Sequence, residues 1–149
     1  MPSLVGSEMC IRDSIGTVPD AVQVGPKVCL INKYSASDGD LFPWGFRALG
    51  LGKLIGTRTW GGIVGISGSL PYMDGTDIRV PFFTSFDPKT GSWIIENHGV
   101  DPDILIDNDP VKEWNGEDQQ LDRAIQEVMK ELQDRKPLPG VPTPRDFSK

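Results

Sequence analysis

The sequence predicts a mixed α/β (α+β) domain built around one core. The chain has 149 residues, enough for one domain, and its apolar fraction of 38% and charged fraction of 24% are those of an ordinary soluble globular protein. Short apolar runs bounded by glycine or proline alternate along the chain with segments that carry helix signals. Such alternation is typical of α/β and α+β folds.

The first predicted unit is a strand, a turn and a helix. Residues 27–32 follow a glycine–proline pair as an apolar run, which indicates a buried strand. Residues 34–40 are small and polar, as a tight strand-to-helix turn requires. Asp38 or Asp40 can cap the helix that follows, which we expect to extend to about Leu49.

The remaining elements follow from local patterns. We expect Pro43 in the first turn of that helix, where its missing N–H costs little. The clearest helix is 118–134, because four apolar residues fall on one stripe, namely Leu121, Ile125, Met129 and Leu132. Strands are expected at 53–56, within the glycine-rich run 57–68, and at 78–86 and 92–96, whereas 104–106 is only a short apolar piece between acidic turns. Residues 136–149 are proline-rich and predict an extended tail.

Composition excludes several classes of function. The net charge of −6 argues against a nucleic-acid partner, since phosphate binding needs clustered lysine and arginine. The sequence contains no apolar run long enough to span a membrane. With only Cys10, Cys29 and one histidine, we expect no zinc site, no disulfide framework and no cofactor. Cys29 lies in an apolar run and is interpreted as a small buried hydrophobe.

Residues 1–14 are interpreted as an artefact rather than as native protein. Residues 4–13 match an in-frame translation of a transposase adapter used to prepare sequencing libraries. A signal peptide is the competing interpretation, but charged residues interrupt any apolar h-region. We therefore expect native sequence to begin near Ile15, and the N-terminal part of the domain to be missing.

Ser37 is the strongest candidate for catalysis. It lies between a predicted buried strand and a helix N-terminus, so its hydroxyl is held at an exposed turn. Nearby backbone N–H groups, that of Asp38 included, can face developing negative charge. Taken alone, a serine before an acidic helix start is more often a simple helix cap.

Several motifs resemble the tail-specific (C-terminal processing) serine protease family. Ser35-Ala36-Ser37 is similar to the family's Ser-Ala-Ser motif, in which the second serine is the nucleophile. The tricorn-like branch is indicated by Asp38-Gly39-Asp40, by residues 58–62 and by residues 96–103. The resemblance covers most of 25–132, and it implies a crotonase-like ββα catalytic core that is incomplete at its N-terminus. Residues 15–135 are accordingly interpreted as the C-terminal part of the catalytic domain.

The chain departs from the family at the general base. In the processing branch a lysine lies 25 residues after the nucleophile, but that position is Gly62 here. Lys53 is the nearest later lysine and matches no motif. The tricorn branch instead takes a histidine and a second oxyanion donor from the N-terminal half of the domain, which precedes residue 15. His98 is the only histidine in this chain, and its position is not that of the catalytic histidine, although the sequence does not exclude a contact with Ser37.

Two further sets of residues are assigned by resemblance and by local chemistry. Glu96 matches the family's tetrad glutamate, which helps to orient the catalytic histidine; a solvated surface glutamate is the alternative. Trp60, Gly61 and Gly62 are expected to border the substrate cleft, because glycines let a peptide backbone approach closely. Burial of Trp60 in the core is equally compatible with the sequence.

The sequence therefore predicts a serine peptidase that forms an acyl-enzyme on Ser37 and acts on a peptide or protein. This chain alone is expected to be inactive. The alternative is a non-catalytic scaffold of the same fold that binds extended peptides, and handling of acyl-CoA lacks support. An oligomeric full-length form and a cytoplasmic or periplasmic location both stay open.

Overall fold

A computed structural model describes residues 23–68, 71–137 and 140. The residues Pro26–Gln133 form one compact unit, and all elements discussed below belong to it. The segment 1–14, which we interpret as an artefact, and most of the tail 136–149 lie outside the described residues.

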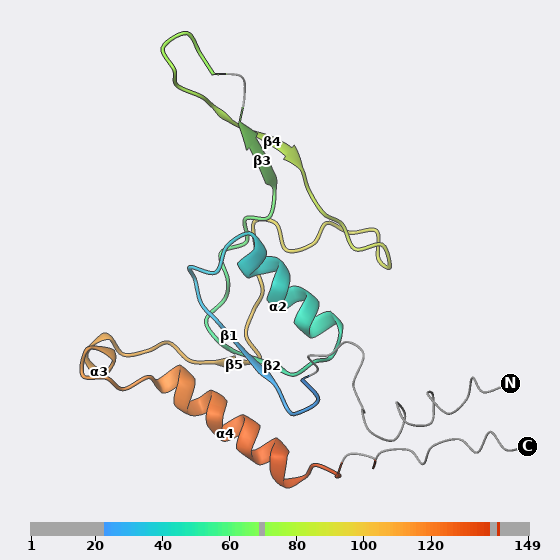
Figure 1. The fold of residues 1–149 in the computed structure, drawn as a ribbon, viewed down its shortest axis with the longest axis vertical. Coiled ribbons are helices and arrows are strands. Elements are labelled where there is room, and N and C mark those ends of the chain that lie inside the picture. The colour runs from blue at the N-terminus through green and yellow to red at the C-terminus, as the bar shows by residue number, and fades with distance from the viewer. Residues whose placement is uncertain (1–22, 69–70, 138–139, 141–149) are drawn as a thin grey trace, which may run out of the picture. The chain divides into compact units, whose positions relative to one another are not determined.

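A three-stranded parallel sheet forms the centre of this unit (Figure 1). Its order is β1 (Val28–Ile31), β2 (Lys53–Gly56) and β5 (Ile104–Leu105). Successive side chains of a strand point to opposite faces, and both Leu54 and Ile55 are fully buried. Both faces of the central strand are therefore covered, which explains why the predicted strand 53–56 is apolar over consecutive positions.

Helices α2 (Asp38–Ala48) and α4 (Gln119–Gln133) both pack on β1 and β2, and Figure 1 shows them flanking the strands. The core on the α2 side comprises Ile31, Phe46, Leu54 and Val100, with Cys29 packed at its border. Burial raises the pKa of the Cys29 thiol. Both helices lie close to the bounds that the sequence predicts.

The expected place of Pro43 was wrong by about one turn. Ser37 is the N-cap residue and α2 begins at Asp38, so Pro43 falls in the second turn instead of the first. It is fully buried, and its ring removes the N–H that would donate to the carbonyl of Gly39.

Helix α4 contacts the sheet mainly through a face other than its apolar stripe. Ala124 and Glu127 are buried, and Glu127 pairs with Lys53 at 2.6 Å and with Arg123 at 2.6 Å. The hydrogen bond from Lys53 holds the pKa of Glu127 below its ordinary value. The four residues of the stripe are between 42% and 54% exposed, namely Leu121, Ile125, Met129 and Leu132.

Two further elements complete the fold. A hairpin of β3 (Gly65–Gly68) and β4 (Arg79–Phe83) forms a separate antiparallel sheet. A short helix, α3 (Pro110–Trp114), was not expected; its N-cap Asp109 accepts hydrogen bonds from the first turn.

The expected strand at 92–96 was wrong, since only an isolated bridge joins Trp93 to Phe86. In the part of the chain that the structure describes, no helix is long and apolar enough to span a membrane.

Candidate active site

Ser37 occupies a constrained turn between β1 and α2. It is exposed, and its backbone has φ 56° and ψ −111°. Positive φ is uncommon for a residue with a side chain and is often found at functional sites. Among the described non-glycine residues only Ile95 and Asn97 share it, and these two flank Glu96. Positive φ therefore occurs at Ser37 and on both sides of Glu96, the two residues that the family resemblance nominates for catalysis.

A buried carboxylate holds this turn together. Asp40, in the first turn of α2, is 0% exposed and accepts hydrogen bonds from three backbone amides. The Ser37 N–H donates to Oδ2 at 3.0 Å, the Gly61 N–H to Oδ1 at 2.8 Å and the Gly62 N–H to Oδ2 at 3.2 Å. Sequence reasoning gave Asp40 only a capping role. Its contacts with the distant glycines depend on tertiary structure, which no local pattern reveals.

The amides at the N-terminus of α2 differ in what they can bind. The Ser37 N–H is taken by Asp40 and by the Gly62 carbonyl at 3.2 Å. The Asp38 N–H has no hydrogen-bond partner among the described residues. It is therefore the amide next to Ser37 that is free to donate a hydrogen bond to a developing oxyanion.

Glu96 is fixed from two directions. Its Oε2 accepts hydrogen bonds from the Ile63 N–H at 2.7 Å and the Val64 N–H at 3.0 Å. The backbone beside it is anchored by the Asn97 N–H, which donates to the Gly61 carbonyl at 2.7 Å. Its carboxylate is thus held in one orientation against the loop that follows β2.

Ser37 and Glu96 line one cleft of about 560 Å³. Trp60 and Gly62 also line it, and Trp60 is 66% exposed, so it is not a core residue. Most of the other lining side chains are apolar, namely Val64, Ile66, Pro81 and Phe83. Gly61 is not among the lining residues; it is buried, close to the backbone of His98 and Gly99.

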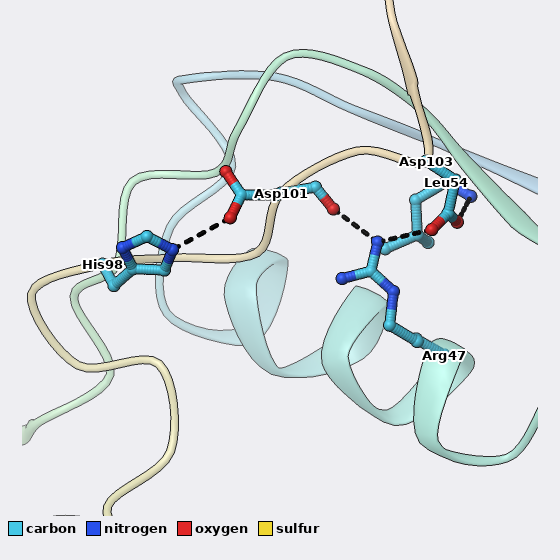
Figure 2. Close-up of polar contacts among 5 residues, drawn as sticks. All are labelled: Arg47, Leu54, His98, Asp101 and Asp103. Atoms are coloured by element: carbon cyan, nitrogen blue, oxygen red, sulfur yellow. Dashed lines mark hydrogen bonds and ion pairs between the residues drawn. The ribbon is translucent and has the colours of Figure 1, made fainter.

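The two alternative bases, His98 and Lys53, do not line the cleft. His98 instead pairs with Asp101 (Figure 2), with 2.9 Å between Nε2 of the histidine and Oδ2 of the aspartate. Lys53 donates to Glu127, and this hydrogen bond raises the pKa of the lysine, so it is held in its protonated form. Among the described residues, no cluster of His, Cys, Asp and Glu side chains could hold a metal ion.

A second network fixes the segment that follows Glu96. Arg47 on α2 donates to the Asp101 carbonyl at 2.5 Å and to the Asp103 carboxylate at 2.9 Å (Figure 2). The same carboxylate accepts from the Leu54 N–H at 2.7 Å. The residues after Glu96 are thereby joined both to α2 and to the central strand.

Comparisons with known proteins point to one family. The model of peptidase family S41 matches residues 8–106. The chain is 40% identical over 132 residues to the tricorn protease of Thermoplasma acidophilum, an alignment that covers 89% of this chain and 12% of that protein. It is 46% identical over 109 residues to the tricorn protease of Thermoplasma volcanium, covering 73% of this chain and 10% of that protein.

A solved structure agrees with these matches. The crystal structure of the tricorn protease superposes with a TM-score of 0.65 at 45% identity, over 71% of this chain and 10% of that one. The present chain thus spans only about a tenth of the length of the relatives that it matches.

Proposed function

The chain belongs to peptidase family S41, and from that membership we propose that it carries the nucleophile of a serine peptidase, Ser37. The observation that supports this assignment is the constrained turn: Ser37 has positive φ, lies exposed at the start of α2 and lines a cleft together with Glu96. The parallel sheet with its flanking helices also agrees with the crotonase-like core that the family resemblance implies.

In the proposed reaction, the Ser37 Oγ attacks the carbonyl carbon of a substrate peptide bond. A histidine supplied from outside this chain takes the hydroxyl proton and gives it to the leaving amine as the C–N bond breaks. The Asp38 N–H, together with a second donor from outside the chain, binds the oxyanion. Water then hydrolyses the acyl-enzyme and regenerates Ser37.

Glu96 supports the base in this scheme rather than the nucleophile. Its Oε2 is held by two amides of the cleft wall, so its carboxylate is pre-oriented. A fixed carboxylate at the cleft can orient a neighbouring group that positions the histidine and can stabilise the charged form of that histidine. Trp60 and Gly62 border the bound peptide.

The test is a segment exchange. In what we call the exchange protein, residues 23–133 of this chain replace the aligned segment of the Thermoplasma acidophilum tricorn protease, which supplies the rest of the catalytic domain. The exchange protein is expected to hydrolyse fluorogenic peptides, and Ser37→Ala is expected to abolish hydrolysis. Glu96→Gln should lower kcat, because the base loses its support.

Two outcomes would count against the proposal. If Ser37→Ala leaves hydrolysis unchanged, another residue is the nucleophile. If the exchange protein binds peptides but never cleaves them, the scaffold alternative is favoured. The isolated chain is expected to show no cleavage, and cleavage that Ser37→Ala abolishes would refute that expectation.

A further inference from the structure

Asp40 is a buried titratable group that the proposed reaction does not use. It is 0% exposed, and no basic side chain of the described residues pairs with it. Buried carboxylates are usually paired with a cation, as Glu127 is with Lys53 and Arg123. Asp40 instead satisfies both of its oxygens with three backbone N–H groups.

These three amides belong to two segments that meet at the cleft. One is the turn that carries Ser37, and the other is the loop after β2 that carries Gly61 and Gly62. The Ser37 N–H also donates to the Gly62 carbonyl, which closes a small network around the carboxylate. Asp40 thus joins the turn at Ser37 to the cleft wall formed by Trp60 and Gly62.

An ordinary helix cap does not account for this arrangement. A capping role requires only the bond from Ser37, whereas the bonds to Gly61 and Gly62 cross 21 and 22 residues of sequence. A carboxylate is suited to the task because it only accepts hydrogen bonds, and its charge strengthens each of them. An asparagine in its place has nearly the same shape, but its NH₂ group is a donor and cannot accept a hydrogen bond from the N–H groups that it would face.

We propose that Asp40 is a positioning residue for the Ser37 nucleophile. Its carboxylate holds Ser37 in the positive-φ conformation and fixes the distance between the Ser37 turn and the cleft wall at Gly62. Ser37 is thereby kept at the cleft, and the Asp38 N–H next to it in sequence stays without a hydrogen-bond partner among the described residues. Asp40 itself touches no substrate. This inference rests on the proposed function, and its test separates the two.

The first arm of the test uses the full chain and needs no activity. In isotope-labelled wild type, NMR couplings through the hydrogen bonds should join the Asp40 carboxyl carbon to the amide nitrogens of Gly61 and Gly62. Asp40→Asn should change the amide shifts of Ser37, Gly61 and Gly62. Glu127→Gln, which alters a buried carboxylate that does not line the cleft, should leave those three amides unchanged. Absence of the couplings in folded wild type overturns the proposal, even if Asp40→Asn fails to fold.

The second arm measures kinetics in the exchange protein. A displacement of about 1 Å at a nucleophile lowers rates by about 100-fold, so Asp40→Asn should lower kcat by about that factor and leave KM within about 3-fold. Glu127→Gln should leave kcat within about 3-fold of wild type, since its carboxylate is not part of the site. A loss that falls on KM alone, or a kcat near that of wild type, overturns the positioning role.

The Ser37→Ala variant distinguishes the two claims. If it abolishes hydrolysis while Asp40→Asn does not, the proposed function stands and the role of Asp40 falls. If Ser37→Ala retains hydrolysis, the nucleophile assignment itself is wrong, and the positioning of that nucleophile falls with it.

Discussion

Gly61 offers a sharp test of how the Glu96 segment is anchored. Its φ is +87°, and a Cβ placed there would lie 2.8 Å from the backbone N of His98 and closer still to the N of Gly99. Alanine at this position adds about 1–2 kcal/mol for the left-handed conformation and about 1–3 kcal/mol for overpacking against rigid backbone. Gly61→Ala should therefore destabilise the fold by about 2–5 kcal/mol.

Two other glycines separate these contributions. Gly75 has φ +82° and nothing within 4 Å, so Gly75→Ala should show only the conformational cost of about 1–2 kcal/mol. Gly45, inside α2, also has open space, so Gly45→Ala should stabilise the chain by about 0.5–1 kcal/mol. Urea unfolding of the three variants and wild type measures the change in the free energy of unfolding for each glycine. If Gly61→Ala is no more destabilising than Gly75→Ala, the close packing of residue 61 against the segment after Glu96 is refuted.

Three other predictions concern the core, the cleft and pH. Leu54→Ala should lower the free energy of unfolding by about 2–5 kcal/mol, because Leu54 is fully buried; a loss under 1 kcal/mol in urea unfolding would contradict this. Trp60→Ala in the exchange protein should raise KM about 5–30-fold with little effect on kcat, since burial of the indole by bound substrate contributes about 1–2 kcal/mol of binding free energy. Unchanged peptide kinetics would count against this role of Trp60. Pairing with Lys53 lowers the pKa of Glu127 below the ordinary 4.5. The stabilisation of the fold by this pair is therefore present above that pH and is lost as pH falls through the lowered pKa. The melting temperatures of wild type and Glu127→Gln should differ at neutral pH and converge in acid, whereas a constant difference would contradict the pairing.

The unit from β1 to β2 could be predicted from sequence because its signals are local. The apolar run before Asn32 gave the strand, and the acidic residues after Ser37 marked the start of α2. Resemblance to a family then singled out Ser37 and Glu96, and the structure brings both to one cleft. No single-residue pattern would have chosen these two side chains from among the serines and glutamates of the chain.

Features that depend on distant contacts could not be predicted in this way. The proposed role of Asp40 depends on hydrogen bonds from Gly61 and Gly62, which lie 21 and 22 residues away in sequence. Hydrophobic periodicity does not predict such distant contacts. The apolar stripe of α4 is present in the sequence, but the helix buries the neighbouring face with Ala124 and Glu127, and Glu127 forms a salt bridge with Lys53 on β2. Near Glu96, apolar composition indicated a strand, yet tight turns at Ile95 and Asn97 end the extended backbone.

Helix α3 was missed although a local signal was present. Asp109 followed by Pro110 is an N-cap residue before a proline at the first helical position, which is a common helix start. Acidic residues around such a start are equally typical of a solvated turn. A five-residue helix with no buried residue has too little apolar periodicity to be recognised by its pattern.

Covalent labelling tests the central claim most directly. The exchange protein is treated with diisopropyl fluorophosphate, digested and analysed by mass spectrometry. We expect one diisopropylphosphoryl group on the peptide that contains Ser37, in step with loss of hydrolysis, and none on that peptide in Ser37→Ala. Inactivation with the adduct on a different residue would show that the hydroxyl at this turn is not the nucleophile.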